Sequence, residues 1–292
     1  MVRVNRFIAL AAVLALSLFA AQTTFAGAGG VAGDSFTVVG PIGVLELEPN
    51  LWTTDPLGAG GLADEYTYQL FGPESADYRF CAKWQAGGVE VPVAVRRTTK
   101  GDGNTWMWFS KFEGSATTYL LFGNADTDTP TVMDANEDGL DDIVVVRNVS
   151  LGTGGDALQW RVRDGLGQEA GKLPPATFLF GPADSDPVPG NWDGDSVNGD
   201  EPAVTRAGPG EDGGAPSLNK LWQWDNGQGG VGSQMKGLPG DTNVAYTSNG
   251  QTRPGVGQVS GGTNAVRVET AVGPEVVIIG PDTTVPIGNC NL

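Results

Sequence analysis

The stretch LFGNADTDTPTVMDANEDGLDDIVVVR, Leu121–Arg147, contains the three features that recur along the chain and decide its fold. It opens with Leu-Phe-Gly, continues through an Asp-rich loop, and ends in a β-branched run closed by Arg. The same tripeptide ends at Gly72, Gly123 and Gly181, so these marker glycines are 51 and 58 residues apart. The pattern indicates a repeat about 50 residues long.

The spacing inside the repeat is nearly constant. The β-branched segments end at Arg96, Arg147 and Arg206, which lie 24, 24 and 25 residues after the marker glycines. A Trp-bearing segment follows each of them: Trp106–Trp108, Leu158–Trp160 and Leu221–Trp224. A weaker fourth copy begins near Gly237, and partial copies lie near both ends, at residues 36–41 and 276–292.

Each copy is typical of several short strands joined by turns, and no amphipathic helical pattern follows the N-terminal segment. A unit of about 50 residues with three or four strands has the size of one propeller blade. We therefore expect residues 27–292 to form one all-β domain, a β-propeller of four to five blades. A solenoid or a β-sandwich is the alternative. The Trp side chains are expected to fill the space between blades, and stacking on a ligand is the alternative role.

Composition narrows the possible functions. The chain of 292 residues has 45 Gly, 19 Pro and eight Trp, which suits short strands with Gly-rich turns around a real core. It has no His, which excludes Ser-His-Asp and Cys-His catalysis and every His-ligated metal or haem site. The formal net charge of −17 disfavours binding to nucleic acid or anionic membranes and favours hard cations.

Residues 1–26 have the three parts of a secretory signal peptide. Arg3 and Arg6 precede an apolar run, Phe7–Ala21, and small residues follow at Ala26 and Ala28. The run of 15 residues is shorter than the roughly 20 that a membrane span needs, so the alternative of a membrane anchor is less favoured. We expect cleavage after Ala26 or Ala28, no span in the mature chain, and a secreted or cell-surface protein.

The chain has two cysteines, Cys81 and Cys290. In an oxidising compartment two cysteines allow one disulfide, and closure of the repeat would bring the C-terminal copy toward the first blade. We therefore expect a Cys81–Cys290 disulfide, with two buried free thiols as the alternative.

The loop in the second copy follows the first nine positions of an EF-hand-type calcium loop. Oxygen side chains stand at positions 1, 3, 5 and 9, Gly139 stands at position 6, and a main-chain carbonyl serves position 7. Val145 stands at position 12, where an EF-hand has Glu, and a strand follows instead of a helix. The alternative is an acidic turn that folds without metal. The expected calcium ligands are Asp134, Asn136, Asp138, Leu140 (carbonyl) and Asp142.

The third copy has a similar loop with an insertion. Its last carboxylate ligand is either Asp200 or Glu201. The corresponding loops of the first copy, Lys83–Glu90, and of the fourth, Thr247–Arg253, have too few carboxylates to predict calcium. The other expected ligands in the third copy are Asn191, Asp193, Asp195 and Val197 (carbonyl).

Phe-Gly-Pro-Ala at 180–183, the Asp-x-Asn-x-Asp-Gly-x-x-Asp loop at 134–142 and the hydrophobic strand ending in Arg together resemble FG-GAP/VCBS-type repeats. The resemblance covers Leu70 to Arg206 well and the chain from Gly237 poorly. It implies an integrin-α-like β-propeller with calcium in blade loops, at the ligand positions named above. It also implies a scaffold that often presents an adhesive or binding surface.

These observations favour a secreted, non-catalytic calcium-binding module for binding or adhesion, with an extracellular protein or carbohydrate as its ligand. One alternative is an exported hydrolase or lyase that acts on polysaccharide through two carboxylates. Glu65, Asp164 and Glu269 are the acidic residues considered for it, and nothing in their spacing marks a pair. A purely structural surface-layer or matrix protein is the third possibility.

Overall fold

The computed structural model describes residues 35–40, 49–56, 67–73, 76–85, 90–98, 104–110, 118–166, 176–195, 199–208, 219–248, 251–260, 263–270, 273–281 and 285–288. Over these ranges the chain forms twenty strands and a single turn of 3₁₀ helix, η1, at Gly152–Gly154. The prediction of an all-β protein is therefore confirmed. No helix in these ranges is long and apolar enough to cross a lipid bilayer.

The strands form five four-stranded antiparallel sheets, which we number I to V. Sheet I has the order β20-β1-β2-β3 and joins the two ends of the described chain. Its strands are β1 (Ser35–Gly40), β2 (Pro49–Pro56), β3 (Thr67–Pro73) and β20 (Val285–Gly288).

Sheets II to V each contain four strands that are consecutive in sequence and neighbours in space. Sheet II contains β4 (Tyr78–Ala82), β5 (Val91–Thr98), β6 (Thr105–Ser110) and β7 (Thr118–Asn124). Sheet III contains β8 (Asp128–Met133), β9 (Asp142–Ser150), β10 (Asp156–Arg163) and β11 (Ala176–Pro182). Sheet IV contains β12 (Asp186–Pro187), β13 (Ala203–Ala207), β14 (Lys220–Asp225) and β15 (Val231–Met235). Sheet V contains β16 (Thr242–Ser248), β17 (Gln251–Ser260), β18 (Thr263–Thr270) and β19 (Gly273–Pro281).

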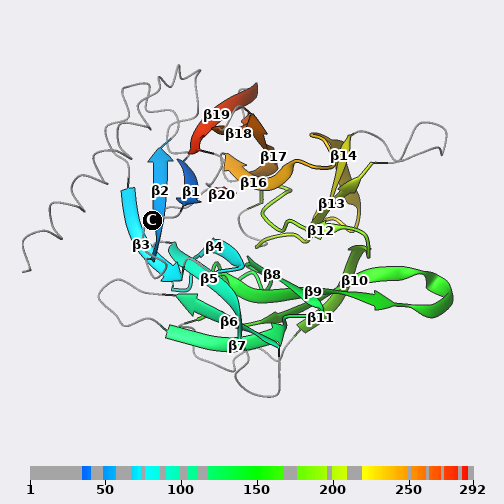
Figure 1. Ribbon diagram of the computed structural model, residues 1–292. Helices are drawn as coiled ribbons and strands as arrows, with labels where there is room; N and C mark the ends of the chain where they lie inside the picture. The colour runs from blue at the N-terminus through cyan, green and yellow to red at the C-terminus, as the bar shows by residue number, and fades with distance from the viewer. Residues whose placement is uncertain are drawn as a thin grey trace, which may run out of the picture.

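The sheets contact one another in a closed series. Strand β3 of sheet I contacts β5 of sheet II, β4 contacts β8 of sheet III, and β11 contacts β13 of sheet IV. The main-chain N–H of Thr252 in sheet V donates to the carbonyl of Asn191 before β13, and β16 contacts β20 of sheet I. Figure 1 shows the five sheets following one another around a common centre.

The core lies between consecutive sheets. In β9 the four residues from Ile143 to Val146 are all buried, because this strand is covered on both faces. Side chains alternate along a strand, so Ile143 and Val145 join the apolar cluster with sheet II, whereas Val144 and Val146 join the cluster with sheet IV. This explains the continuous apolar run in the sequence, since a strand buried on both faces has no polar side to alternate with.

The marker glycines are required by the geometry of the turn that follows them. Their φ angles are +92°, +83° and +80°, a region that side-chain-bearing residues rarely adopt. A Cβ atom at each would also lie 2.4–2.7 Å from a valine methyl of the next sheet. The pairs are Gly123 with Val145, Gly181 with Val204, and Gly237 with Val256. The fourth copy therefore keeps this contact although it lacks the Leu-Phe that precedes the other glycines.

Three fully buried tryptophans are equivalent in the same way. Each donates its indole N–H to the carbonyl of the residue just before a marker glycine. The bonds are Trp108 to Phe122 at 3.0 Å, Trp160 to Phe180 at 3.0 Å, and Trp222 to Lys236 at 3.1 Å. Trp222, and not Trp224, is thus the third member of the set. Trp224 instead stacks on Trp192, with ring centroids 5.2 Å apart.

Candidate functional site

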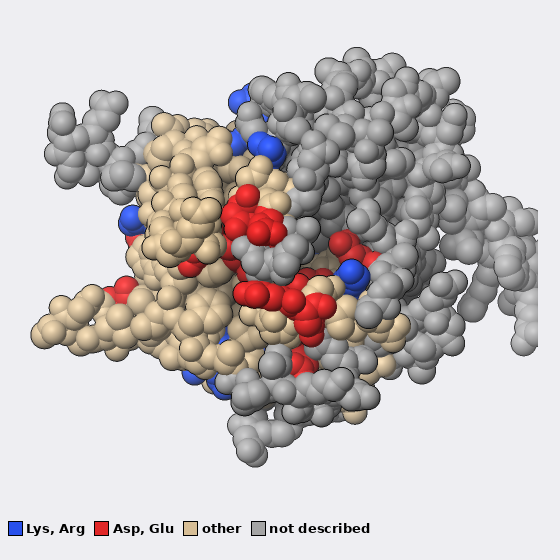
Figure 2. All heavy atoms as spheres, turned by 180° about the vertical axis from the view of Figure 1, so that it is seen from behind, with Lys and Arg blue, Asp and Glu red and all other residues tan. Residues whose placement is uncertain are grey.

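The two acidic loops occupy equivalent places in neighbouring sheets. Loop III, residues 134–141, connects β8 to β9, and loop IV, residues 188–202, connects β12 to β13. Acidic side chains gather near the middle of the face seen in Figure 2. We number loop positions from Asp134 in loop III and from Asn191 in loop IV.

In loop III the side chains at positions 1, 3 and 5 turn inward and accept main-chain N–H groups. Asp134 accepts from Asp138 at 3.2 Å and from Gly139 at 2.9 Å. Asn136 accepts from the N–H of Asp138, and Asp138 accepts from that of Leu140, both at 2.9 Å. Gly139 has a φ of +79°, which allows the sharp bend that the spacing predicts.

Asp142, at position 9, closes loop III from the first position of β9. Its side chain is fully buried, and its Oδ2 accepts from the N–H of Ala135 at 3.3 Å. Burial raises the pKa of Asp142 to about 7, and the negative charges of Asp138, Asp164 and Asp134 add to the shift. The predicted final ligand therefore faces the loop in a region where negative charge accumulates.

Loop IV repeats this pattern with a longer side chain at its end. Asn191 accepts from the N–H of Gly194, and Asp193 accepts from that of Asp195, both at 2.8 Å. The Oε2 of Glu201 accepts from Trp192 at 2.7 Å and from Asp193 at 3.2 Å. Burial raises the pKa of Glu201 to about 7. Val197, the predicted carbonyl ligand, lies outside the described residues.

Asp200 does not face loop IV but contacts loop III. Its N–H donates to the carbonyl of Asp134 at 2.8 Å, and its Oδ2 accepts from the N–H of Asp134 at 3.0 Å. A Cβ at Gly199 would lie 2.5 Å from the same carbonyl. Burial raises the pKa of Asp200 to about 6, with contributions from Asp134 and Glu90. Of the two alternatives for the last ligand, Glu201 and not Asp200 takes the place of Asp142.

Asp141 makes the same two-way contact one sheet earlier. Its N–H donates to the carbonyl of Lys83 at 2.8 Å, and its Oδ2 accepts from the N–H of Lys83. We call this two-way contact the carboxylate clasp. Asp141 and Asp200 each precede the repeat Arg by six residues. That shared register was the signal in the sequence, but the pattern of metal ligands assigned Asp141 no role.

The electrostatics of the two loops point to a missing positive charge. Burial raises the pKa of Asp141 well above its usual range, and Asp200, Glu90 and Asp134 add to the shift. Burial also raises the pKa of Asp134. Within the described residues no three acidic side chains close around a single point. A carboxylate has about four acceptor sites, however, so one N–H contact leaves others for a ligand. The all-oxygen donor set has the chemistry that a hard cation takes.

The remaining predicted residues are distributed as follows. Asp164 is buried at 8% exposure and interacts electrostatically with Asp142, so it belongs to the surroundings of loop III. Cys81 is disulfide-bonded, whereas Cys290, the second cysteine, lies outside the described residues. The predicted signal peptide, residues 1–26, and Glu65 also lie outside them, and Glu269 falls in β18 with no description of its side chain.

A comparison of the chain with protein-family models found no match, and neither did a comparison with curated proteins.

Proposed function

We propose that the chain is a secreted, non-catalytic module for binding or adhesion, built as a five-bladed β-propeller whose loops III and IV bind calcium. Its ligand is an extracellular protein or carbohydrate. The disulfide at Cys81 supports an oxidising compartment, because such bonds persist mainly in exported proteins. The resemblance of Leu70–Arg206 to FG-GAP/VCBS-type repeats favours the same assignment.

The sheet order supports the propeller. Four sheets are sequential meanders, and the fifth is completed by β20 from the far end of the chain. The strands that begin each unit contact one another in turn, as in β4 with β8, β20 with β4, and β16 with β20. Radial repetition of this kind lets each small sheet bury both faces against its neighbours.

The observation that carries the calcium proposal is the repeated inward turn of oxygens in loops III and IV. In both loops the side chains at positions 1 and 3 accept N–H groups from within the loop, and the carboxylate of Asp142 or Glu201 reaches back to position 2. Calcium would supply the positive charge that these groups lack and hold each loop in one conformation. The proposed ligands are Asp134, Asn136, Asp138, Leu140 and Asp142 in loop III and Asn191, Asp193, Asp195, Val197 and Glu201 in loop IV.

Thermal unfolding of the full chain in calcium and in chelator tests the proposal. We expect calcium to raise the midpoint of the wild type by several degrees, because a ligand that binds only the folded state stabilises it by RT ln(1 + [L]/Kd). Asp138→Asn keeps an oxygen for the N–H of Leu140 but removes a charge from loop III, so its gain from calcium should be smaller.

Asp225→Asn is the matched control. Asp225 also accepts an N–H two residues further on, from Gly227 at 3.0 Å, but it lies in the β14–β15 turn outside both loops. Its gain from calcium should equal that of the wild type. An identical midpoint in calcium and chelator for the wild type would refute calcium binding.

A further inference from the structure

A depression of about 510 Å³ lies between sheets II and III, at the opposite end of β8 from loop III. Its walls come from three places: the start of β4, the end of β5 with the start of β6, and the turn between β7 and β8. The side chains that the inference uses are Asp77, Tyr78, Arg97, Trp106 and Asp126, with Asn104 beside them.

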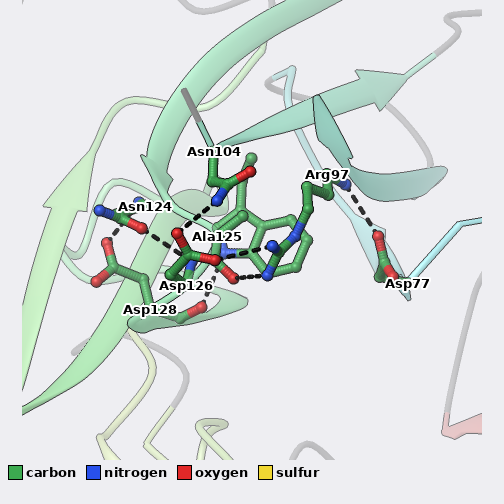
Figure 3. Close-up of polar contacts among 8 residues, drawn as sticks. Asp77, Arg97, Asn104, Asn124, Ala125, Asp126 and Asp128 are labelled. Carbon is green, nitrogen blue, oxygen red and sulfur yellow. Dashed lines mark hydrogen bonds and ion pairs between the residues drawn. The ribbon is translucent and has the colours of Figure 1, made fainter. Parts of the chain in front are cut away.

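The polar groups of this depression are held in place by one another (Figure 3). Arg97 donates to the carboxylate of Asp126 at 2.8 Å and to the carbonyl of Ala125 at 2.7 Å, and its own N–H donates to Asp77 at 2.9 Å. Asn104 donates to the other oxygen of Asp126. The side chains of Arg97 and Asp126 are nevertheless 47% and 50% exposed, so both still face solvent.

The other repeats show that this residue set is not a consequence of the fold. Arg97 directly follows the repeat Arg, and its counterparts in sheets III and IV are Asn148 and Ala207. The counterparts of the other residues follow from the same registers. Trp106 is replaced by Leu158 and Lys220, and Tyr78 is replaced by Thr129 and Pro187. The guanidinium and both aromatic rings thus occur together at one junction among the three that these positions compare.

We propose that this depression binds a neutral carbohydrate. The inference rests on the proposed binding function and names the class of its ligand. Donors, from Arg97 and Asn104, alternate with acceptors, from Asp77 and Asp126. A sugar hydroxyl both donates and accepts, whereas an anion would use only the donors and a cation only the acceptors.

The shape and the aromatic residues favour the same ligand class. The half-buried ring of Tyr78 packs edge-on against Trp106, with centroids 5.4 Å apart, and supplies an amphipathic surface beside the polar groups. The depression is open and mostly polar, unlike the enclosed apolar pockets that take small drug-like molecules. It therefore suits part of an extended oligosaccharide that remains partly in solvent.

An array of immobilised neutral and acidic oligosaccharides, probed with the full chain in calcium, tests this inference. The strongest neutral ligand is then titrated by calorimetry into the wild type, Arg97→Ala and Asp126→Asn. We expect both variants to bind at least tenfold more weakly, because each loses a hydrogen bond that involves a charged group. Asp184→Asn is the control, since exposed Asp184 is the repeat counterpart of Asp126, and its affinity should stay within twofold of the wild type.

Thermal unfolding of each variant checks the fold, and Asp126→Asn preserves the shape of the side chain in case Arg97→Ala loosens the turn. Binding to no neutral glycan, binding only to acidic glycans or to a protein ligand, or equal affinity in all variants would overturn the inference. The calcium proposal is read separately from the midpoints in calcium and chelator, so either proposal can fail while the other stands.

Discussion

The two ends of each sheet differ in how strictly the repeat is kept. At the end that holds the marker glycines, the same glycine–valine contact and the same indole hydrogen bond recur in sheets II, III and IV. At the end that holds the loops, the inward-turned oxygens occur in loops III and IV but have no equivalent in Lys83–Glu90. The first end therefore maintains the architecture, whereas the second is free to acquire chemistry.

A pair of glycine substitutions should show the largest difference between the two ends. Gly181→Ala places a methyl 2.7 Å from Val204 at a φ of +83°, so we expect a loss of about 2–4 kcal/mol in the free energy of unfolding. Gly139→Ala has a similar φ of +79° but meets nothing within 4 Å, so it should lose only about 1–2 kcal/mol. Denaturant unfolding in chelator measures both. Equal losses would mean that backbone strain alone, and not packing against the next sheet, requires glycine at the marker.

The clasp of Asp200 should give an intermediate effect, because it joins loop III to loop IV. Asp200→Ala removes the acceptor for the N–H of Asp134 and should cost about 1–3 kcal/mol, the cost of leaving a partly buried donor unsatisfied. Asp200→Asn retains an acceptor oxygen and should lose less than half as much. Urea unfolding of both variants measures the difference. If Asp200→Asn costs as much as Asp200→Ala, then the charge and not the hydrogen bond is what stabilises the junction.

The sequence contains enough information to predict the all-β fold, because strand patterns and turn glycines are local. It is also sufficient to find loops III and IV, since their oxygens lie within a few residues of one another. The clasps could not be predicted, because Asp141 and Asp200 contact residues 58 and 66 positions earlier in the chain. Counting from the marker glycine also paired Trp224 with Trp160, although the contact with Lys236 shows that Trp222 is the equivalent residue.

The smallest expected effect tests whether loop length and side-chain length compensate for each other at the loop end. Loop IV reaches its repeat Arg in 15 residues from position 1, and loop III does so in 13. Loop IV ends in Glu where loop III ends in Asp, and the longer side chain brings Oε2 to 2.7 Å from the N–H of Trp192. Glu201→Asp shortens that reach by one methylene, so we expect a loss of about 1 kcal/mol and a smaller rise of the midpoint with calcium. Glu201→Gln keeps the reach but removes the charge, so it should keep most of the stability in chelator and also gain less from calcium. The two variants separate geometry from charge in thermal scans with and without calcium. A Glu201→Asp variant with unchanged midpoints in both conditions would show that the loop, and not the side chain, absorbs the insertion.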